Sequence, residues 1–134
     1  MELDEVNMLN DICGKICLKH RLADTLDKKL EDIFGERYRK AMSLIEGGSV
    51  KCYIFRPSGR VIWEVKGSRG VYQVMPHINF CSCDDYYFRV MDAKKQLCYH
   101  LIAQRLAYAL NRFEKMEFPD KDYGKITKRW KAIK

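Results

Sequence analysis

The chain has 134 residues, of which 47% are hydrophobic and 12% aromatic, so we expect one packed domain rather than a disordered chain. Its net charge of +7 is unevenly spread: residues 1–36 carry five Lys or Arg and nine Asp or Glu, which leaves +11 on the remainder. No apolar run approaches the roughly 20 residues of a membrane helix, and the acidic N-terminus is unlike a signal peptide. These features predict a soluble, intracellular protein with no membrane partner.

Three helices are predicted before the first strand. Over residues 3–20, apolar side chains recur at helical spacing behind an acidic start. A second helix begins at Asp24 or Thr25 and ends at Gly35, a residue type that commonly follows a helix C-terminus. Tyr38–Ile45 forms a third, short helix that ends before two glycines.

The pattern then changes to period two, which predicts a three-stranded antiparallel β-meander. The first strand, Val50–Phe55, is apolar on both faces, so we expect both faces to be covered. RPSGR at residues 56–60 is a predicted turn before the second strand, Val61–Lys66. GSRG at residues 67–70 is a second turn before the third strand, Val71–Met75.

The C-terminal part is predicted to contain the longest helix and a basic tail. The helix is predicted over Leu97–Lys115, with an apolar stripe, and is expected to end at the FPD sequence, residues 118–120. In the tail, Ile126, Trp130 and Ile133 recur at helical spacing. An amphipathic helix that docks on a partner, base stacking, binding to an anionic membrane and disorder of the free tail remain alternatives.

Four potential metal ligands occur as two pairs. Cys81 and Cys83 lie two residues apart after the third strand, and Cys98 and His100 lie two apart at the start of the predicted long helix. Thiolate and imidazole suit zinc, and four such ligands complete a tetrahedral shell that leaves no position for an activated water. We therefore predict one structural zinc ion. The alternative is a chance grouping of buried cysteines.

The order Cys-x-Cys, spacer, Cys-x-His between a β-meander and a helix resembles the SWIM zinc-finger family. The extension Cys-x-His-x-x-Ala, which adds Ala103, strengthens the resemblance. The segments IFGERYRKAMSLIE, PSGR and YQV resemble small SWIM proteins of the Shu type, over roughly residues 30–110. The resemblance implies that both ligand pairs bind zinc and that Ala103 is small because the helix packs close to the zinc loop. Asp84 and Asp85 depart from the family pattern, which argues against DNA contact at that edge.

The resemblance also implies a function. Members of this family are not enzymes; they pair with a paralogue of the RecA-class recombinase and support recombinase filaments on single-stranded DNA. We therefore expect a non-enzymatic recombination and DNA-repair factor with no small-molecule substrate, in the cytoplasm of an archaeon or the nucleus of a eukaryote. Two alternatives are a protein-interaction adaptor without DNA binding and a DNA-binding regulator of transcription or transposition.

The expected fold class is α+β. It comprises an N-terminal helical segment (residues 1–48), a SWIM-type zinc-binding domain (residues 49–115) and a basic C-terminal tail (residues 116–134). Basic residues with aromatic neighbours are the candidates for single-stranded DNA contact, because charge holds phosphates and rings stack on bases. These candidates are Lys94 and Lys95 in the zinc loop; Arg105, Tyr108, Arg112 and Lys115 as a stripe on the long helix; and Lys128, Arg129 and Trp130 in the tail. An ordinary solvated surface is the alternative for each.

Three further potential ligands, Cys13, Cys17 and His20, share one face of the first predicted helix. They are candidates for a second zinc site, but no fourth ligand is evident and apolar residues share that face. Positions facing the core are therefore the favoured interpretation. Cys52, which alternates with apolar residues on the first strand, is likewise predicted to be a core cysteine.

Overall fold

The computed structural model of the chain describes residues 4–67, 70–76, 80–83 and 97–131. Its first three elements are the predicted helices α1 (Glu5–Cys17), α2 (Asp24–Phe34) and α3 (Glu36–Glu46). Asp4 caps α1, because its Oδ1 atom accepts a hydrogen bond from the backbone N–H of Asn7 at 3.1 Å. Gly35 separates α2 from α3 with a φ angle of +56°, which L-residues rarely adopt. The local sequence thus specifies both boundaries.

Among the residues that the structure describes, the sheet has five strands in the order β4-β3-β2-β1-β5. The strands are β1 (Val50–Arg56), β2 (Arg60–Lys66), β3 (Val71–Met75), β4 (Phe80–Cys81) and β5 (Glu114–Pro119). The predicted antiparallel meander is confirmed as β1, β2 and β3. Two strands were not predicted: β4 pairs antiparallel with β3, and β5 pairs parallel with β1. The meander is therefore the centre of a wider sheet.

The predicted helix over Leu97–Lys115 is present, but it is shorter than expected. Helix α4 covers Tyr99–Leu110, and Asn111 ends it in the left-handed conformation (φ 57°, ψ 41°). Asparagine tolerates this conformation better than most residues, and it closes many helices. The chain then enters β5, where half-buried Met116 and Phe118 alternate with exposed charged residues. Strand β5 crosses the predicted boundary between residues 115 and 116.

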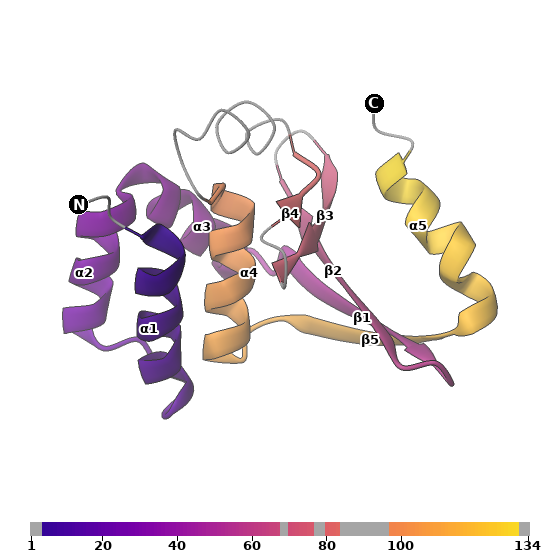
Figure 1. Ribbon diagram of the computed structural model, residues 1–134, viewed down its shortest axis with the longest axis horizontal. Coiled ribbons are helices and arrows are strands. Elements are labelled where there is room, and N and C mark those ends of the chain that lie inside the picture. Colours follow the sequence, from indigo (N-terminus) through magenta and orange to yellow (C-terminus); the bar gives the residue numbers. More distant parts are fainter. Residues whose placement is uncertain (1–3, 68–69, 77–79, 84–96, 132–134) are drawn as a thin grey trace.

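The sheet buries apolar side chains on both faces, as predicted for its first strand. One face, which includes Cys52 and Trp63, belongs to the main core with α1, α3 and α4. The other face presents Tyr53, Phe55 and Ile62 to a smaller core. Figure 1 shows α1–α4 grouped on one side of the sheet, with α5 (Tyr123–Lys131) standing apart from them on the other side. Cys52 is 4% exposed, which confirms it as a core cysteine.

The tail forms helix α5 after the short 3-10 helix η3 (Asp120–Asp122). Ile126 packs against the smaller core, so this part of the tail docks on the sheet of its own chain. The carboxylate of Asp120 accepts hydrogen bonds from the backbone N–H and hydroxyl of Ser58, at 3.0 and 2.7 Å. This contact fastens η3 to the β1–β2 turn. Within the described residues, no helix is long and apolar enough to cross a bilayer.

Candidate metal centre

The two predicted ligand pairs come together at one end of the sheet. Cys81 lies on β4, where it pairs with Val74 of β3, and Cys83 follows two residues later. Cys98 is the N-cap residue of α4, and His100 lies in the first turn of that helix. The ligand atoms of all four residues lie within 4.8 Å of one another. Side chains 17 residues apart in the sequence therefore form one cluster, as predicted.

The residues of this cluster fit a zinc ion. Zn–S bonds of about 2.3 Å in a tetrahedral shell place the ligand atoms about 3.8 Å apart, so the cluster needs only a small contraction around the metal. All four side chains are buried, and none is more than 3% exposed. Three thiols and an imidazole in such a position match a structural zinc site, which holds four protein ligands and no water.

His100 supplies the most direct sign of a metal site. Both of its ring nitrogens are buried, and among the described residues neither has a hydrogen-bond partner outside the cluster. Buried polar atoms normally have a partner, and a metal bond satisfies one of these nitrogens. The imidazole is held between aromatic rings, because the ring centroids of Tyr72 and Tyr99 lie 4.7 and 4.1 Å from its own. Gly67 lies against its Nε2 atom, where a Cβ would stand only 2.8 Å away.

The protonation of the three thiols follows from their proximity. Cys83 accepts hydrogen bonds from the Cys81 and Cys98 thiols, which lowers the pKa of Cys83 well below its usual range. The pKa of Cys81 is raised by its hydrogen bonds with the other two thiols, and burial raises the pKa of Cys98. Zinc binding must therefore displace the protons of Cys81 and Cys98.

Ser82, between the first two ligands, fastens their turn to the sheet. Its backbone N–H donates to the carbonyl of Gln73 at 3.0 Å, and its hydroxyl accepts from the Gln73 N–H at 3.0 Å. This reciprocal pair extends the β3–β4 ladder by one residue past Cys81. Sequence analysis missed Ser82, although a hydroxyl residue between two ligands was a visible signal.

Ala103, the last residue of the extended motif, is fully buried on α4. It lies one helical turn after His100, within the main core. A small side chain at this position agrees with the close packing that the resemblance implies.

Comparisons with known proteins agree with this geometry, although no protein-family model matches the chain. The chain is 31% identical over 116 residues to zinc finger SWIM domain-containing protein 7 of Mus musculus. The aligned region covers 85% of this chain and 76% of the mouse protein. The chain belongs to the family of this SWIM protein. It is also 27% identical over 115 residues to the homologue from Dictyostelium discoideum, covering 81% of this chain and 74% of that protein. The protein of the same name from Danio rerio is 29% identical over 111 residues, covering 81% of this chain and 79% of the relative.

In this SWIM protein, the predicted basic stripe does not form one helix face. Arg105 and Tyr108 lie on α4, but Arg112 follows the helix and Lys115 lies on β5. The Arg105 guanidinium is half-buried and donates to the carbonyl of Pro76 at 2.8 Å and to the side chain of Asn10. Burial also lowers the pKa of Arg105. Its contacts are those of a residue that joins α4 to α1 and to the end of β3.

The other candidates for DNA contact differ in how exposed they are and in whether the structure describes them. Tyr108 is 59% exposed and packs edge-to-face on Trp63, with ring centroids 6.0 Å apart. Exposed side chains are found at Arg112, Lys115 and Lys128. Lys94 and Lys95 lie outside the described residues, as do the side chains of Arg129 and Trp130, whose backbone belongs to α5.

The three potential ligands near α1 do not form a metal cluster within the described part of the chain. Cys13 and Cys17 are half-buried against the main core, as predicted. Burial raises the pKa of Cys13 to about 12, and its thiol donates to the carbonyl of Arg105 at 3.7 Å. His20 instead lies exposed after α1, where its Nδ1 atom is 3.0 Å from the carbonyl of Ala109.

Proposed function

We propose that this protein is a non-enzymatic accessory factor in homologous recombination and DNA repair. In this role it binds a paralogue of the RecA-class recombinase and single-stranded DNA. The observation that carries the proposal is the closed Cys81, Cys83, Cys98 and His100 cluster in a chain of the SWIM family. The segments before and within the meander that resemble Shu-type proteins give the recombination context.

The chemistry of the cluster supports a role without catalysis. Zinc with four protein ligands has no position for a substrate or an activated water. Cys98 and His100 are a potential nucleophile and base, and as zinc ligands they would both be engaged. Zinc here would join β4 to α4 and stabilise the fold. Any ATP hydrolysis by the assembly would then belong to the recombinase paralogue.

The groove between α1 and α4 is the surface that best suits the protein partner. It has a volume of about 570 Å³, and Cys13, Cys17 and Trp63 are among the residues that line it. Exposed Tyr108 also lines the groove, and interfaces are enriched in such aromatic residues. Gly14 also lines the groove, and a Cβ at this position would have no neighbouring atom within 4 Å. The groove can therefore be filled by substitution without a clash at that position.

The test is co-purification of the full chain with a RecA-class recombinase paralogue from the same organism. Gly14→Leu fills the groove, and because leucine favours a helix over glycine by up to about 1 kcal/mol, the variant should remain folded. We expect it to lose the recombinase paralogue. Gly124→Leu is the matched control, because Gly124 is also a helical glycine with open space around its Cβ. Equal binding by both variants would exclude the groove, and no binding by the unmodified chain would contradict the proposed partner.

The basic part of the chain supports the second half of the proposal, contact with single-stranded DNA. Residues after 36 carry +11, and on α5 the side chains of Lys125 and Lys128 are both exposed. The two alternative functions predict different DNA binding by the isolated chain. An adaptor has no DNA affinity without its partner. A regulator of transcription or transposition prefers duplex DNA and depends on its sequence.

A further inference from the structure

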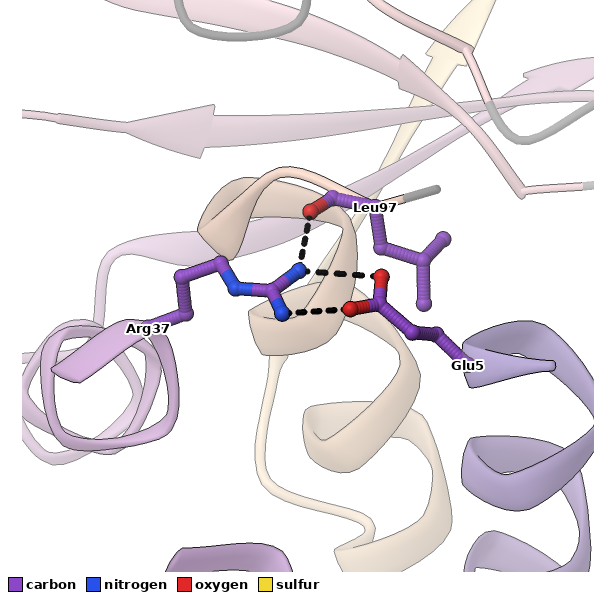
Figure 2. Close-up of polar contacts among 3 residues, drawn as sticks. All are labelled: Glu5, Arg37 and Leu97. Carbon is purple, nitrogen blue, oxygen red and sulfur yellow. Dashed lines mark hydrogen bonds and ion pairs between the residues drawn. The ribbon is translucent and has the colours of Figure 1, made fainter. Parts of the chain in front are cut away.

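Arg37 links helices α1 and α3 to Leu97, the residue immediately before the second pair of zinc ligands. This residue lies in the first turn of α3 and is 9% exposed. Its Nη1 atom donates to the carbonyl of Leu97 at 2.8 Å. Nη1 and Nη2 also donate to the two carboxylate oxygens of Glu5, in the first turn of α1, at 3.1 and 2.6 Å. Figure 2 shows the guanidinium pointing toward both partners.

The Leu97 carbonyl matters because the next residue is the ligand Cys98. A peptide unit is planar, so an atom that fixes the Leu97 oxygen also fixes the amide nitrogen of Cys98. On its other side, the carbonyl of Cys98 accepts from the N–H of Ile102 at 3.2 Å. Both peptide units that flank Cys98 are therefore held. Together they set the direction of its Cα–Cβ bond toward the other ligands.

Helix α3 makes a second contact within the same ligand pair. The Lys40 ammonium lies 5.4 Å from the ring centroid of Tyr99, the residue between Cys98 and His100. The Tyr99 ring in turn lies against the His100 imidazole. One helix thus contacts the chain immediately before Cys98 and immediately after it. This arrangement is that of a support for the ligands and not of a distant packing contact.

Glu5 keeps the Arg37 guanidinium in place. A buried guanidinium needs a counter-charge, and a carboxylate that accepts two parallel hydrogen bonds fixes its orientation. Since Glu5 belongs to α1, the orientation of Arg37 depends on how α1 is docked. We propose that Arg37 is a positioning residue of the zinc centre, which presents Cys98 to the metal and couples metal binding to the docking of α1. Arg37 has this role whether or not the protein acts in recombination.

The test uses Co²⁺ in place of zinc in the full chain, because the visible absorption of Co²⁺ reports the geometry of its ligands. In Arg37→Met we expect an altered Co²⁺ spectrum and faster loss of zinc to a chelator. Loss of a supporting contact of this kind typically weakens metal binding by roughly 10- to 100-fold. Arg39→Met is the matched control, because Arg39 is an exposed arginine on the same helix that pairs with Glu31. It should leave the spectrum and the release rate unchanged.

A second control separates positioning from general stability. Phe118→Leu weakens the smaller core on the opposite face of the sheet, where Phe118 packs near Tyr53 and Phe55. This variant should unfold more easily and keep the Co²⁺ spectrum of the unmodified chain. Should Arg37→Met give no folded protein, Glu5→Gln decides, since it keeps the Leu97 contact but removes the counter-charge. An unaltered Co²⁺ spectrum in Arg37→Met, or in Glu5→Gln if Arg37→Met does not fold, would overturn the proposal. So would a Co²⁺ spectrum of Phe118→Leu that is altered in the same way as that of the tested variant.

Discussion

Gly67, in the turn between β2 and β3, lies against the Nε2 atom of His100 so closely that a Cβ at position 67 would stand 2.8 Å from that nitrogen. The same Cβ would lie 2.9 Å from the Tyr72 ring. The absence of a side chain at this position therefore makes room for a zinc ligand. Sequence analysis identified Gly67 only as a turn residue.

Gly67→Ala should weaken the metal centre. The added methyl group must displace the His100 or Tyr72 ring, and such overpacking typically lowers the free energy of unfolding by about 1–3 kcal/mol. Displacement of a ligand ring should also lower zinc affinity, measured by competition with a chelator. Gly124→Ala, where the Cβ has open space on α5, should leave zinc affinity unchanged and should not lower the free energy of unfolding, because alanine favours a helix over glycine. Equal zinc affinity in both variants would show that the close approach has no role.

Removal of zinc should unfold the part of the chain around the cluster. Cys98→Ser replaces a soft thiolate by a hydroxyl that zinc binds poorly, and structural zinc sites contribute on the order of 10 kcal/mol to folding. We expect the variant to lack zinc and to lose its cooperative thermal transition. Cys52→Ser is the matched control, because Cys52 is also buried but lies outside the cluster. It should lose some stability and keep its zinc.

Zinc affinity should rise with pH. The pKa values of Cys81 and Cys98 are raised, so both thiols keep their protons in the metal-free cluster at neutral pH. Zinc binds thiolates, so these protons are released on binding, and a higher pH favours the bound state. Displacement of two protons predicts a gain in affinity of about 100-fold per pH unit, and stability that depends on zinc is lost as the pH falls. Competition with a chelator of known pH dependence between pH 6 and 8 measures this slope, and a flat profile would contradict it.

The α5 lysines should contribute to single-stranded DNA binding. Each phosphate contact contributes about 0.7 to the slope of log affinity against log salt for single strands, so the double change Lys125→Gln and Lys128→Gln should lower that slope by about 1.4. The double change Lys28→Gln and Lys29→Gln removes the same charge from exposed positions on α2 and should leave the slope unchanged. Fluorescence anisotropy across a salt series gives both values. An equal decrease of this slope in the two variants would mean that net charge, and not the position of the α5 lysines, determines DNA binding.

Sequence analysis predicted the elements whose signals are local. The three N-terminal helices, the meander and the two ligand pairs each have periodicity, turn residues or spacing that can be read within a short window. The predicted end of the long helix was too late because Ile102, Leu106 and Leu110 form a helical stripe, and only Asn111 signals where the helix stops. The period-two pattern of Met116 and Phe118 in β5 was a visible signal, but the partner strand lies about 60 residues earlier.

The residues that position the metal ligands could not be predicted either, because their contacts join helices that are distant in the sequence. Arg37 and Glu5 are ordinary charged residues on two amphipathic helices, and nothing in their local pattern marks them as buried. Their contact exists because α1 and α3 dock on either side of the start of α4. Arg105 shows a similar limit of local patterns, since its helical spacing does not reveal that its guanidinium contacts Asn10 and Pro76.

The measurement that tests the metal centre most directly is X-ray absorption at the zinc edge of the purified full chain, combined with its zinc content. The four-ligand cluster predicts one zinc per chain, with three sulfur ligands at about 2.3 Å and one nitrogen at about 2.0 Å. Cys98→Ser should abolish that signal. A chain with no zinc, or a spectrum with oxygen ligands in place of sulfur, would contradict a closed structural site formed by Cys81, Cys83, Cys98 and His100.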